Sequence, residues 1–246
     1  METLWGIHSV REALAAGRRD IHRLWFEKKR AAGRLAPILS LAGKKKVPAK
    51  AAGPDQLARA CQTRLHQGVC LETGPYPLAD FGELAASGDR AGRSLIVLLD
   101  QIVDPHNLGA ILRTALCAGA RGVVIPRDRS AGPSPSVSRA SAGALEHIRL
   151  ARAPNMAGAI QTLKKKGFWV FGAAADGAES VFSTEWDLKT ALVIGGEEKG
   201  LRPLVKKNCD RLVFIPMAGP VESLNASAAA AVILYQAAGR PGGPGD

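Results

Sequence analysis

Two glycine-rich loops near the end of the chain carry residue types that could hold a small molecule. The first, G-G-E-E-K-G, starts at Gly195 directly after an apolar run over residues 192–194. The second, P-M-A-G-P-V-E-S, starts at Pro216 after an apolar run over residues 212–215. Glycine lets the backbone approach a ligand closely, and ligands of open parallel sheets bind where the strands end. Either loop alone would be an ordinary turn, but together they favour a site for a flat, polar cofactor.

A third polar motif lies upstream, in D-P-H-N-L-G-A-I-L-R-T-A, which starts at Asp104 after another apolar run. Asp104 and Pro105 are predicted to end that strand, and Asn107 to cap the helix that follows. The apolar stripe of this helix has helical spacing and comprises Leu108, Ile111, Leu112 and Ala115. At about 100° per residue, Arg113 projects from nearly the opposite side. An arginine there is ordinarily just exposed, but this one lies within about a turn and a half of a strand end.

The elements that must position these motifs alternate between strands and helices from Ser94 onward. S-L-I-V-L-L-D, over residues 94–100, is a continuous apolar run, as expected of a strand that is buried on both faces. Further strands are predicted at residues 122–125, 169–173, 192–194 and 212–215, and helices at residues 108–118, 137–145, 156–166 and 201–207. This alternation predicts an α/β fold with a parallel sheet.

Residues 1–73 are predicted to form a smaller α/β unit. Ser9 would cap a helix over residues 10–16, and residues 23–27 alternate like a strand. The remaining elements are two helices and a closing strand, at residues 35–42, 54–63 and 68–72. Basic residues are dense enough here to predict an RNA-binding surface: Arg18, Arg19, Arg23, Lys28, Lys29, Arg30, Arg34, Lys44, Lys45 and Lys46.

Segments rich in glycine, proline and charge separate and follow the two predicted domains. Residues 74–93 are predicted to be a linker, with a short amphipathic turn at residues 78–86. The larger domain then covers residues 94–238. Residues 239–246, G-R-P-G-G-P-G-D, are predicted to be a disordered tail.

Composition limits the class of protein. The chain has 246 residues, of which 46% are apolar, and a formal net charge of +11, which favours a polyanionic partner such as nucleic acid. Its four cysteines form no CxxC pair, and no cysteine or histidine has zinc spacing, so we expect buried thiols and no metal. The N-terminus lacks the apolar core of a signal peptide, and the longest apolar run, at residues 226–235, is too short to span a bilayer. We therefore expect a soluble, cytoplasmic protein without a membrane partner.

The three loop motifs, in their order along residues 94–238, resemble those of the SpoU (TrmH) branch of the SPOUT RNA methyltransferases. They read N-L-G-A-I-L-R-T-A, G-G-E-E-K-G-L and I-P-M-A-G-P-V-E-S-L-N-A-S. The segment W-G-I-H-S-V-R-E-A-L and the later H-Q-G-V resemble the N-terminal domain of the RlmB-type 23S rRNA guanosine 2′-O-methyltransferases, which is similar to ribosomal protein L30e. The resemblance implies a SPOUT domain with a deep C-terminal trefoil knot, an exception to the rule against knots. It also implies a homodimer with the active site at the subunit interface.

This resemblance implies 2′-O-ribose methylation of RNA with S-adenosylmethionine as cofactor. The expected substrate is a guanosine of 23S rRNA or of its assembly precursor. The positions that match the family's polar active-site residues are Asn107, Arg113, Glu197, Ser223 and Asn225. The pattern G-x-E-x-x-G selects Glu197 over its neighbour Glu198. The positions that match the cofactor pocket are Gly195, Gly196, Ile215, Met217 and Leu224.

The role of Arg113 in this chemistry has two readings. Methyl transfer requires the 2′-hydroxyl to lose its proton, and the family arginine has been treated as the base. Because an arginine side chain is effectively always protonated, we favour a guanidinium that grips a phosphate and stabilises the developing 2′-alkoxide. It could act as a base only if its surroundings strip its proton. Arginines of the loop at residues 126–139 are predicted to contact RNA phosphates: Arg127, Arg129 and Arg139.

Three alternatives to this interpretation differ in fold, chemistry or substrate. A Rossmann-type methyltransferase would need a G-x-G turn after its first strand, but this chain has D-P-H-N-L-G there. A non-catalytic RNA-binding protein would use the L30e-like domain alone, which does not explain why all five polar motif positions are filled. The same chemistry on tRNA stays open, because only the resemblance of the N-terminal domain favours rRNA.

Overall fold

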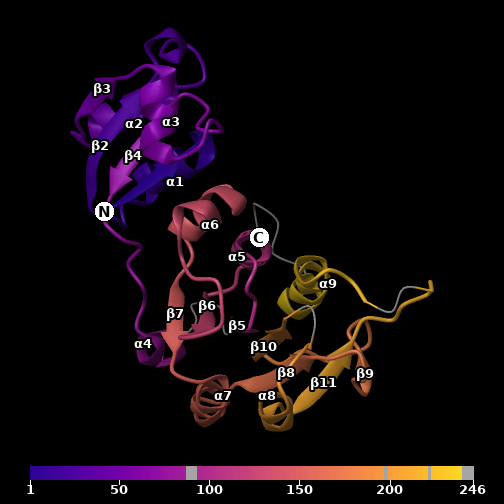
Figure 1. The fold of residues 1–246 in the computed structure, drawn as a ribbon. Coiled ribbons are helices and arrows are strands. Elements are labelled where there is room, and N and C mark those ends of the chain that lie inside the picture. The colour runs from indigo at the N-terminus through magenta and orange to yellow at the C-terminus, as the bar shows by residue number, and fades with distance from the viewer. Residues whose placement is uncertain (87–92, 197–198, 221–222, 240–246) are drawn as a thin grey trace. The chain divides into compact units, whose positions relative to one another are not determined.

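The computed structural model describes residues 1–86, 93–196, 199–220 and 223–239. It divides the chain into two compact units (Figure 1). Unit 1 comprises Met1–Pro77 together with Pro133–His147, and unit 2 comprises Leu78–Gly132 together with Ile148–Asp246. The segment Pro133–His147 therefore packs with the N-terminal residues, although it lies within the stretch that the sequence assigns to the larger domain. The predicted tail lies, except for Gly239, outside the described residues.

Unit 2 is built on one seven-stranded sheet in which all neighbouring strands run parallel, in the order β7-β6-β5-β10-β8-β11-β9. Its strands are β5 (Ser94–Asp100), β6 (Gly122–Pro126), β7 (Leu150–Ala153), β8 (Trp169–Ala173), β9 (Glu179–Ser180), β10 (Lys189–Gly195) and β11 (Arg211–Phe214). The predicted parallel α/β fold is confirmed. The sequence missed β7 and β9, which lie at the two edges of the sheet and lack a continuous apolar run. The trefoil knot stays a prediction.

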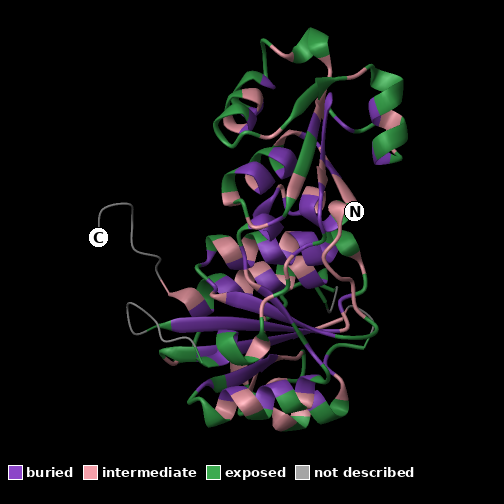
Figure 2. Ribbon diagram, turned by 90° about the vertical axis from the view of Figure 1, so that its left-hand side faces the viewer, coloured by how far each residue is buried: buried purple, intermediate pink, exposed green. Residues whose placement is uncertain are grey.

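Helices cover both faces of this sheet (Figure 1). One face carries α5 (Pro105–Cys117) and α9 (Ala226–Ala238), and the other carries α7 (Met156–Lys165) and α8 (Pro203–Asn208), with the short α4 (Phe81–Ala86) beside β7. Alternate residues of β5 point to opposite faces, so Ile96 and Leu98 pack in the cluster that contains Leu163. Figure 2 shows the buried residues concentrated along the strands, with exposed residues on the outer sides of the helices. Within the described chain, no helix is both long and apolar enough to cross a membrane.

The two helices that follow the site motifs begin in different ways. Asp104 caps α5, since its side chain accepts a hydrogen bond from the backbone N–H of His106 at 2.9 Å. The prediction that Asn107 is the cap is wrong: it lies inside the first turn, because Asp104 followed by Pro105 already supplies the start signal. Asn225 caps α9 as predicted, by accepting a hydrogen bond from the backbone N–H of Ser227 at 2.9 Å.

Unit 1 contains a four-stranded sheet in the order β1-β4-β2-β3. Its elements are β1 (Glu2–Trp5), α1 (Ile7–Ala16), β2 (Ile21–Phe26), η1 (Lys28–Arg30), α2 (Ala36–Lys44), β3 (Ala49–Ala51), α3 (Pro54–Cys61) and β4 (Val69–Thr73). The sequence missed β1 and β3. The prediction that Ser9 caps the first helix is wrong, because Gly6 does so at a φ of 89° and Ser9 is buried within the helix.

The cysteines of unit 1 also differ from the prediction of separate thiols. The structure joins Cys61, at the end of α3, to Cys70 on β4. Both lie in a small apolar cluster with Leu57, against which Trp5 and Trp25 pack. The pairing depends on how α3 lies against β4, which the spacing of cysteines in the sequence does not reveal. Cys117 and Cys209 are free thiols, but Cys117 is exposed and Cys209 only partly buried, so the prediction of buried thiols is wrong for Cys117.

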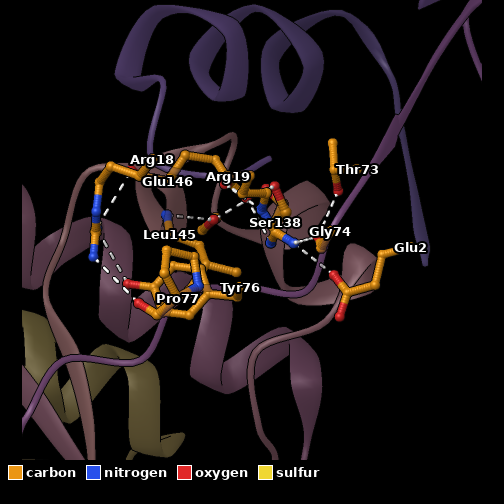
Figure 3. Close-up of polar contacts among 11 residues, drawn as sticks. Glu2, Arg18, Arg19, Thr73, Gly74, Tyr76, Pro77, Ser138, Leu145 and Glu146 are labelled. Atoms are coloured by element: carbon orange, nitrogen blue, oxygen red, sulfur yellow. Dashed lines mark hydrogen bonds and ion pairs between the residues drawn. The ribbon is translucent and has the colours of Figure 1, made fainter. Parts of the chain in front are cut away.

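A buried ionic network fastens the segment Pro133–His147 within unit 1 (Figure 3). Arg19 donates from Nε to Glu146 at 2.6 Å and from Nη1 to Glu2 at 2.6 Å, and the Oγ of Ser138 donates to Glu146 at 2.8 Å. The side chains of Arg19 and Glu146 are 0% and 1% exposed. Arg19 therefore serves packing, and its predicted place on an RNA-binding surface is wrong.

The network holds α6 (Pro135–Ala140) and η2 (Ala144–Glu146) in place of the single helix predicted at residues 137–145. Ala142 and Gly143, at φ angles of 52° and 87°, break that helix in two. Burial alone would lower the pKa of Arg19, but the hydrogen bonds and charges of Glu146 and Glu2 outweigh burial and raise it. The arginine therefore stays charged, and so it neutralises a carboxylate that water cannot reach.

We expect Arg19→Met to lower the free energy of unfolding of unit 1 by about 3–5 kcal/mol, because Glu146 would be left buried without its partner. Hydrogen exchange of unit 1 amides under mild denaturant measures this loss. Arg11→Met is the control, since Arg11 is half exposed in its ion pair with Glu12 and should cost at most about 1 kcal/mol. Equal losses in the two variants would show that the buried pair does not hold unit 1 together.

Candidate active site

Several of the predicted site residues follow the ends of β5, β10 and β11, which lie close together in the sheet of unit 2. β5 and β10 pair in register up to Asp100 and Gly195, their last residues. On the other side of β10 lie β8 and then β11, which ends one residue before Ile215. Because the strands are parallel, the loops that follow them all leave from the same edge of the sheet, where ligands of such sheets bind.

A polar cavity of about 270 Å³ opens beside the ends of β5 and β10. Asn107 from α5 and Gly196 from the loop after β10 line it, together with the side chains of Arg129 and Lys199. The structure therefore brings the motif at residues 107–115 and the glycine-rich loop after β10 to one cavity. Asp104 lines the cavity as well, and one of its carboxylate oxygens is engaged in capping α5. The two cations outnumber this carboxylate, and with the amide of Asn107 they suit a ligand with hydroxyl and anionic groups.

A second, larger cavity of about 500 Å³ opens beside the ends of β8 and β11. Three of the residues predicted for the cofactor pocket line it: Ile215, Met217 and Leu224. Small residues at the end of β8 and directly after it, at positions 173–175, also line it, as does Ser223. We call it the apolar cavity after Ile215, Met217 and Leu224, whose side chains suit the face of an aromatic ring.

A hydrogen bond between two asparagines connects the motif at residues 215–227 with the motif at residues 107–115. The amide Nδ2 of Asn225 donates to Oδ1 of Asn107 at 3.1 Å. The Oδ1 of Asn225 meanwhile accepts the capping bonds of α9, so this one residue fixes both the start of α9 and the amide that lines the polar cavity. Asn107 is only 8% exposed, and its orientation is therefore set by the protein.

A buried aspartate that sequence reasoning missed holds the loop after β10 in place. The side chain of Asp100 is fully buried and accepts hydrogen bonds from the backbone N–H of Arg202 at 3.1 Å and from its Nε at 2.8 Å. The carbonyl oxygen of Asp100 accepts a third bond, from the N–H of Gly196, at 2.9 Å. The sequence offered only an acidic residue at the end of an apolar run, and its partner lies 102 positions away.

The two glycines of this loop are required by the loop itself. A Cβ on Gly195 would overlap the backbone of Gly200, and a Cβ on Gly196 would lie 2.7 Å from the carbonyl oxygen of Gln101. Their small size allows the backbone to fold against backbone. We predicted that these glycines let the backbone approach a ligand. In the structure they let it approach the backbone of Gln101 after β5 and of Gly200 in the same loop. Gly196 also lines the polar cavity.

The remaining predicted residues are spread over different places. Arg113 is exposed on α5 and lines neither cavity. Arg127 is exposed after β6, Arg129 lines the polar cavity, and Arg139 belongs to unit 1. Glu197 lies outside the described residues.

Comparison with known proteins decides the family. Residues 94–235 match the profile of the SpoU rRNA methylase family, and residues 3–79 match the profile of the RNA 2′-O ribose methyltransferase substrate-binding domain. The chain belongs to the SpoU rRNA methylase family. The family and fold class predicted from the three motifs are confirmed, and with them an RNA 2′-O-methyltransferase.

The chain is similar to members of this family along nearly its whole length. A Staphylococcus haemolyticus protein named for the TrmH family of tRNA/rRNA methyltransferases is 40% identical, over 94% of this chain and 92% of its own length. The 23S rRNA (guanosine-2′-O-)-methyltransferase RlmB of Pseudomonas putida is 36% identical, over 96% of each chain. The crystal structure of the SpoU methyltransferase AviRb from Streptomyces viridochromogenes, in complex with AdoMet, is 26% identical with a TM-score of 0.78, over 96% of this chain and 88% of that one.

We expect Asp100→Asn to loosen the loop after β10, because the variant keeps the shape of the side chain but loses the charge that holds Arg202. Loss of a charge-assisted bond, about 1.5–3 kcal/mol, should speed amide exchange at Gly196 and Gly200 by roughly 10- to 100-fold. Hydrogen exchange resolved along the chain measures this. Asp176→Asn is the matched control, since Asp176 is an exposed carboxylate paired with Lys206. Unchanged exchange in Asp100→Asn would contradict the anchoring role.

Proposed function

We propose that the target of this S-adenosylmethionine-dependent RNA 2′-O-methyltransferase is a guanosine of 23S rRNA, and that the reaction takes place at the two cavities described above. The observation that carries the proposal is the hydrogen bond from Asn225 to Asn107. It connects the motif at residues 215–227 with the motif at residues 107–115, beside the polar and the apolar cavity. The similarity to the 23S rRNA enzyme of Pseudomonas putida supports the substrate. The AdoMet complex of the similar Streptomyces enzyme supports the cofactor.

The residues of the apolar cavity fit the adenine end of this cofactor. Ile215 and Leu224 offer apolar atoms for the two faces of a ring, and the residues at positions 173–175 leave room because their side chains are small. The cofactor supplies a methyl group activated by a positively charged sulfur, a chemistry that asks for no metal ion. Within the described chain, no group of three histidine, cysteine or acidic side chains is placed to hold one.

The polar cavity suits the ribose and phosphate of the substrate. Arg129 and Lys199 provide cations for a phosphate, and Asn107 provides an oriented amide for a hydroxyl. Ser223 lies on the wall of the apolar cavity and offers a further hydroxyl next to it. These groups would fix which ribose enters, and orientation of the reacting hydroxyl is itself a large part of catalysis.

Arg113 fits this scheme through a second copy of the chain. It follows Asn107 by six positions, about 9 Å along the helix axis, and its side chain is exposed. We therefore propose the homodimer that the family resemblance implies, in which Arg113 of one copy completes the site of the other. Its guanidinium would bind a phosphate and stabilise the developing 2′-alkoxide, a role that needs its charge and its planar fork.

Methyl transfer to defined RNA tests the proposed function. The purified protein should transfer labelled methyl from S-adenosylmethionine to unmodified 23S rRNA, or to its precursor particle, at one guanosine ribose, equally with and without EDTA. Label in tRNA alone would show that tRNA, and not 23S rRNA, is the substrate. This alternative is kept because relatives are named for both RNAs. RNA binding without transfer to either would make the protein a non-catalytic RNA binder.

Arg113→Lys separates a clamp from a base. Lysine keeps a positive charge but loses the fork that holds phosphate at two points, and it releases its proton more readily than arginine. We expect single-turnover methyl transfer by the variant to stay strongly impaired from about pH 7 to 10, with cofactor affinity unchanged. Arg59→Lys, an exposed change on α3, is the control. Recovery of the variant to the wild-type rate at high pH would show that Arg113 acts as the general base.

A further inference from the structure

Unit 1 carries two adjoining hollows, which we call the basic groove. The larger, about 420 Å³, is lined by Ile7, Lys29, Arg34 and Gln67, among others. The smaller, about 160 Å³, is lined by Gly6, His8 and Arg139, and shares Gln67 with the larger. The shared residue makes the two hollows neighbours on the surface of unit 1.

The charge of the basic groove is of one sign. Lys29, Arg30 and Arg34 line the larger hollow and Arg139 the smaller, and no described carboxylate lines either. A third hollow touches Arg30 as well, but Glu27 and Asp55 line it and would repel an anion. The basic groove therefore ends there, at Arg30, whose side chain is shared between the two hollows.

Three of these cations are not used by the fold. Among the described residues, no side-chain hydrogen bond or ion pair engages Lys29, Arg34 or Arg139, whereas Arg30 pairs with Glu27 at 3.0 Å. The three also differ from Arg19, whose charge is consumed by Glu146. Their charges are therefore available to a partner.

Arg139 is held against another positive group. A Cβ on Gly6 would lie 2.5 Å from Nη1 of Arg139, so this guanidinium lies over the first turn of α1. The start of a helix carries a partial positive charge, and a cation beside it is unfavourable unless an anion joins them. α6, which carries Arg139, is fixed by the bonds from Arg19 and Ser138 to Glu146. The fold thus maintains a concentration of positive charge that an anionic ligand would relieve.

We propose that the basic groove binds the phosphate backbone of the substrate RNA, and that Arg139 brings the segment Pro133–His147 into this contact. The proposal rests on the proposed function for the identity of the polyanion. It extends the substrate-binding region beyond the matched residues 3–79 to a segment of the methylase sequence. Among the residues that the structure describes, no Phe, Tyr or Trp lines either hollow, so the basic groove would bind phosphates and position the RNA without stacking its bases.

The test compares two triple variants of the full-length protein that remove the same charge. Lys29→Gln/Arg34→Gln/Arg139→Gln changes the basic groove. Lys50→Gln/Arg59→Gln/Arg64→Gln changes exposed cations of unit 1 that lie outside it and outside the predicted RNA-binding surface. Binding of unmodified 23S rRNA is measured over a series of salt concentrations. We expect the groove variant to bind about 10- to 100-fold more weakly at low salt, with a salt slope shallower by about 2 to 3, and the control to stay close to wild type.

Further arms decide what a failure means. Equal losses in both triple variants, or no loss in the groove variant, would overturn the proposal. Arg139→Gln alone should weaken binding several-fold, and no effect would remove the segment Pro133–His147 from the contact. At saturating RNA the groove variant should regain the wild-type methylation rate, because it lacks RNA affinity only. A wild-type protein that binds RNA through the basic groove but transfers no methyl would refute the proposed function and leave this inference standing.

Discussion

The candidate site depends on a carboxylate that is buried where a strand ends. Asp100 closes β5, and its oxygens hold both the backbone and the side chain of Arg202, which forces the loop after β10 to turn back across the sheet edge. The turn is tight enough that only glycine fits at positions 195 and 196. A buried charge without its partner is strongly destabilising, so Arg202 is held beside Asp100. Gly196 and Gly200, which this interaction helps to position, line the polar cavity.

Unit 1 depends on the same kind of interaction, used for another purpose. The ion pair between Arg19 and Glu146 fastens a segment of the methylase sequence to the N-terminal region. Two residues with equal formal charge in one short stretch thus take opposite roles: Arg19 is consumed by packing, and Arg34 stays available to a ligand. Burial and partners, which only the folded chain defines, separate them.

The sequence predicted those parts of the molecule that depend on local patterns. Continuous apolar runs identified β5 and β10, and the capping preference of asparagine identified the start of α9. It could not predict which of two neighbouring candidates caps a helix, as with Asp104 and Asn107 at the start of α5. Nor could it predict pairs far apart in the chain, because the 127 positions between Arg19 and Glu146 leave no periodic signal. For the same reason it saw the motif residues but not Asp100, which holds their loop.

The placement of Pro133–His147 also bears on how such proteins can be recombined. The chain passes between the units after Pro77, after Gly132 and again after His147. A chimaera that exchanged only the N-terminal region between two family members would pair Glu146 of one parent with the arginine position of the other. Both segments would have to be exchanged together to keep the buried charges matched. The N-terminal region of this protein is therefore not a portable module, although it is continuous in sequence.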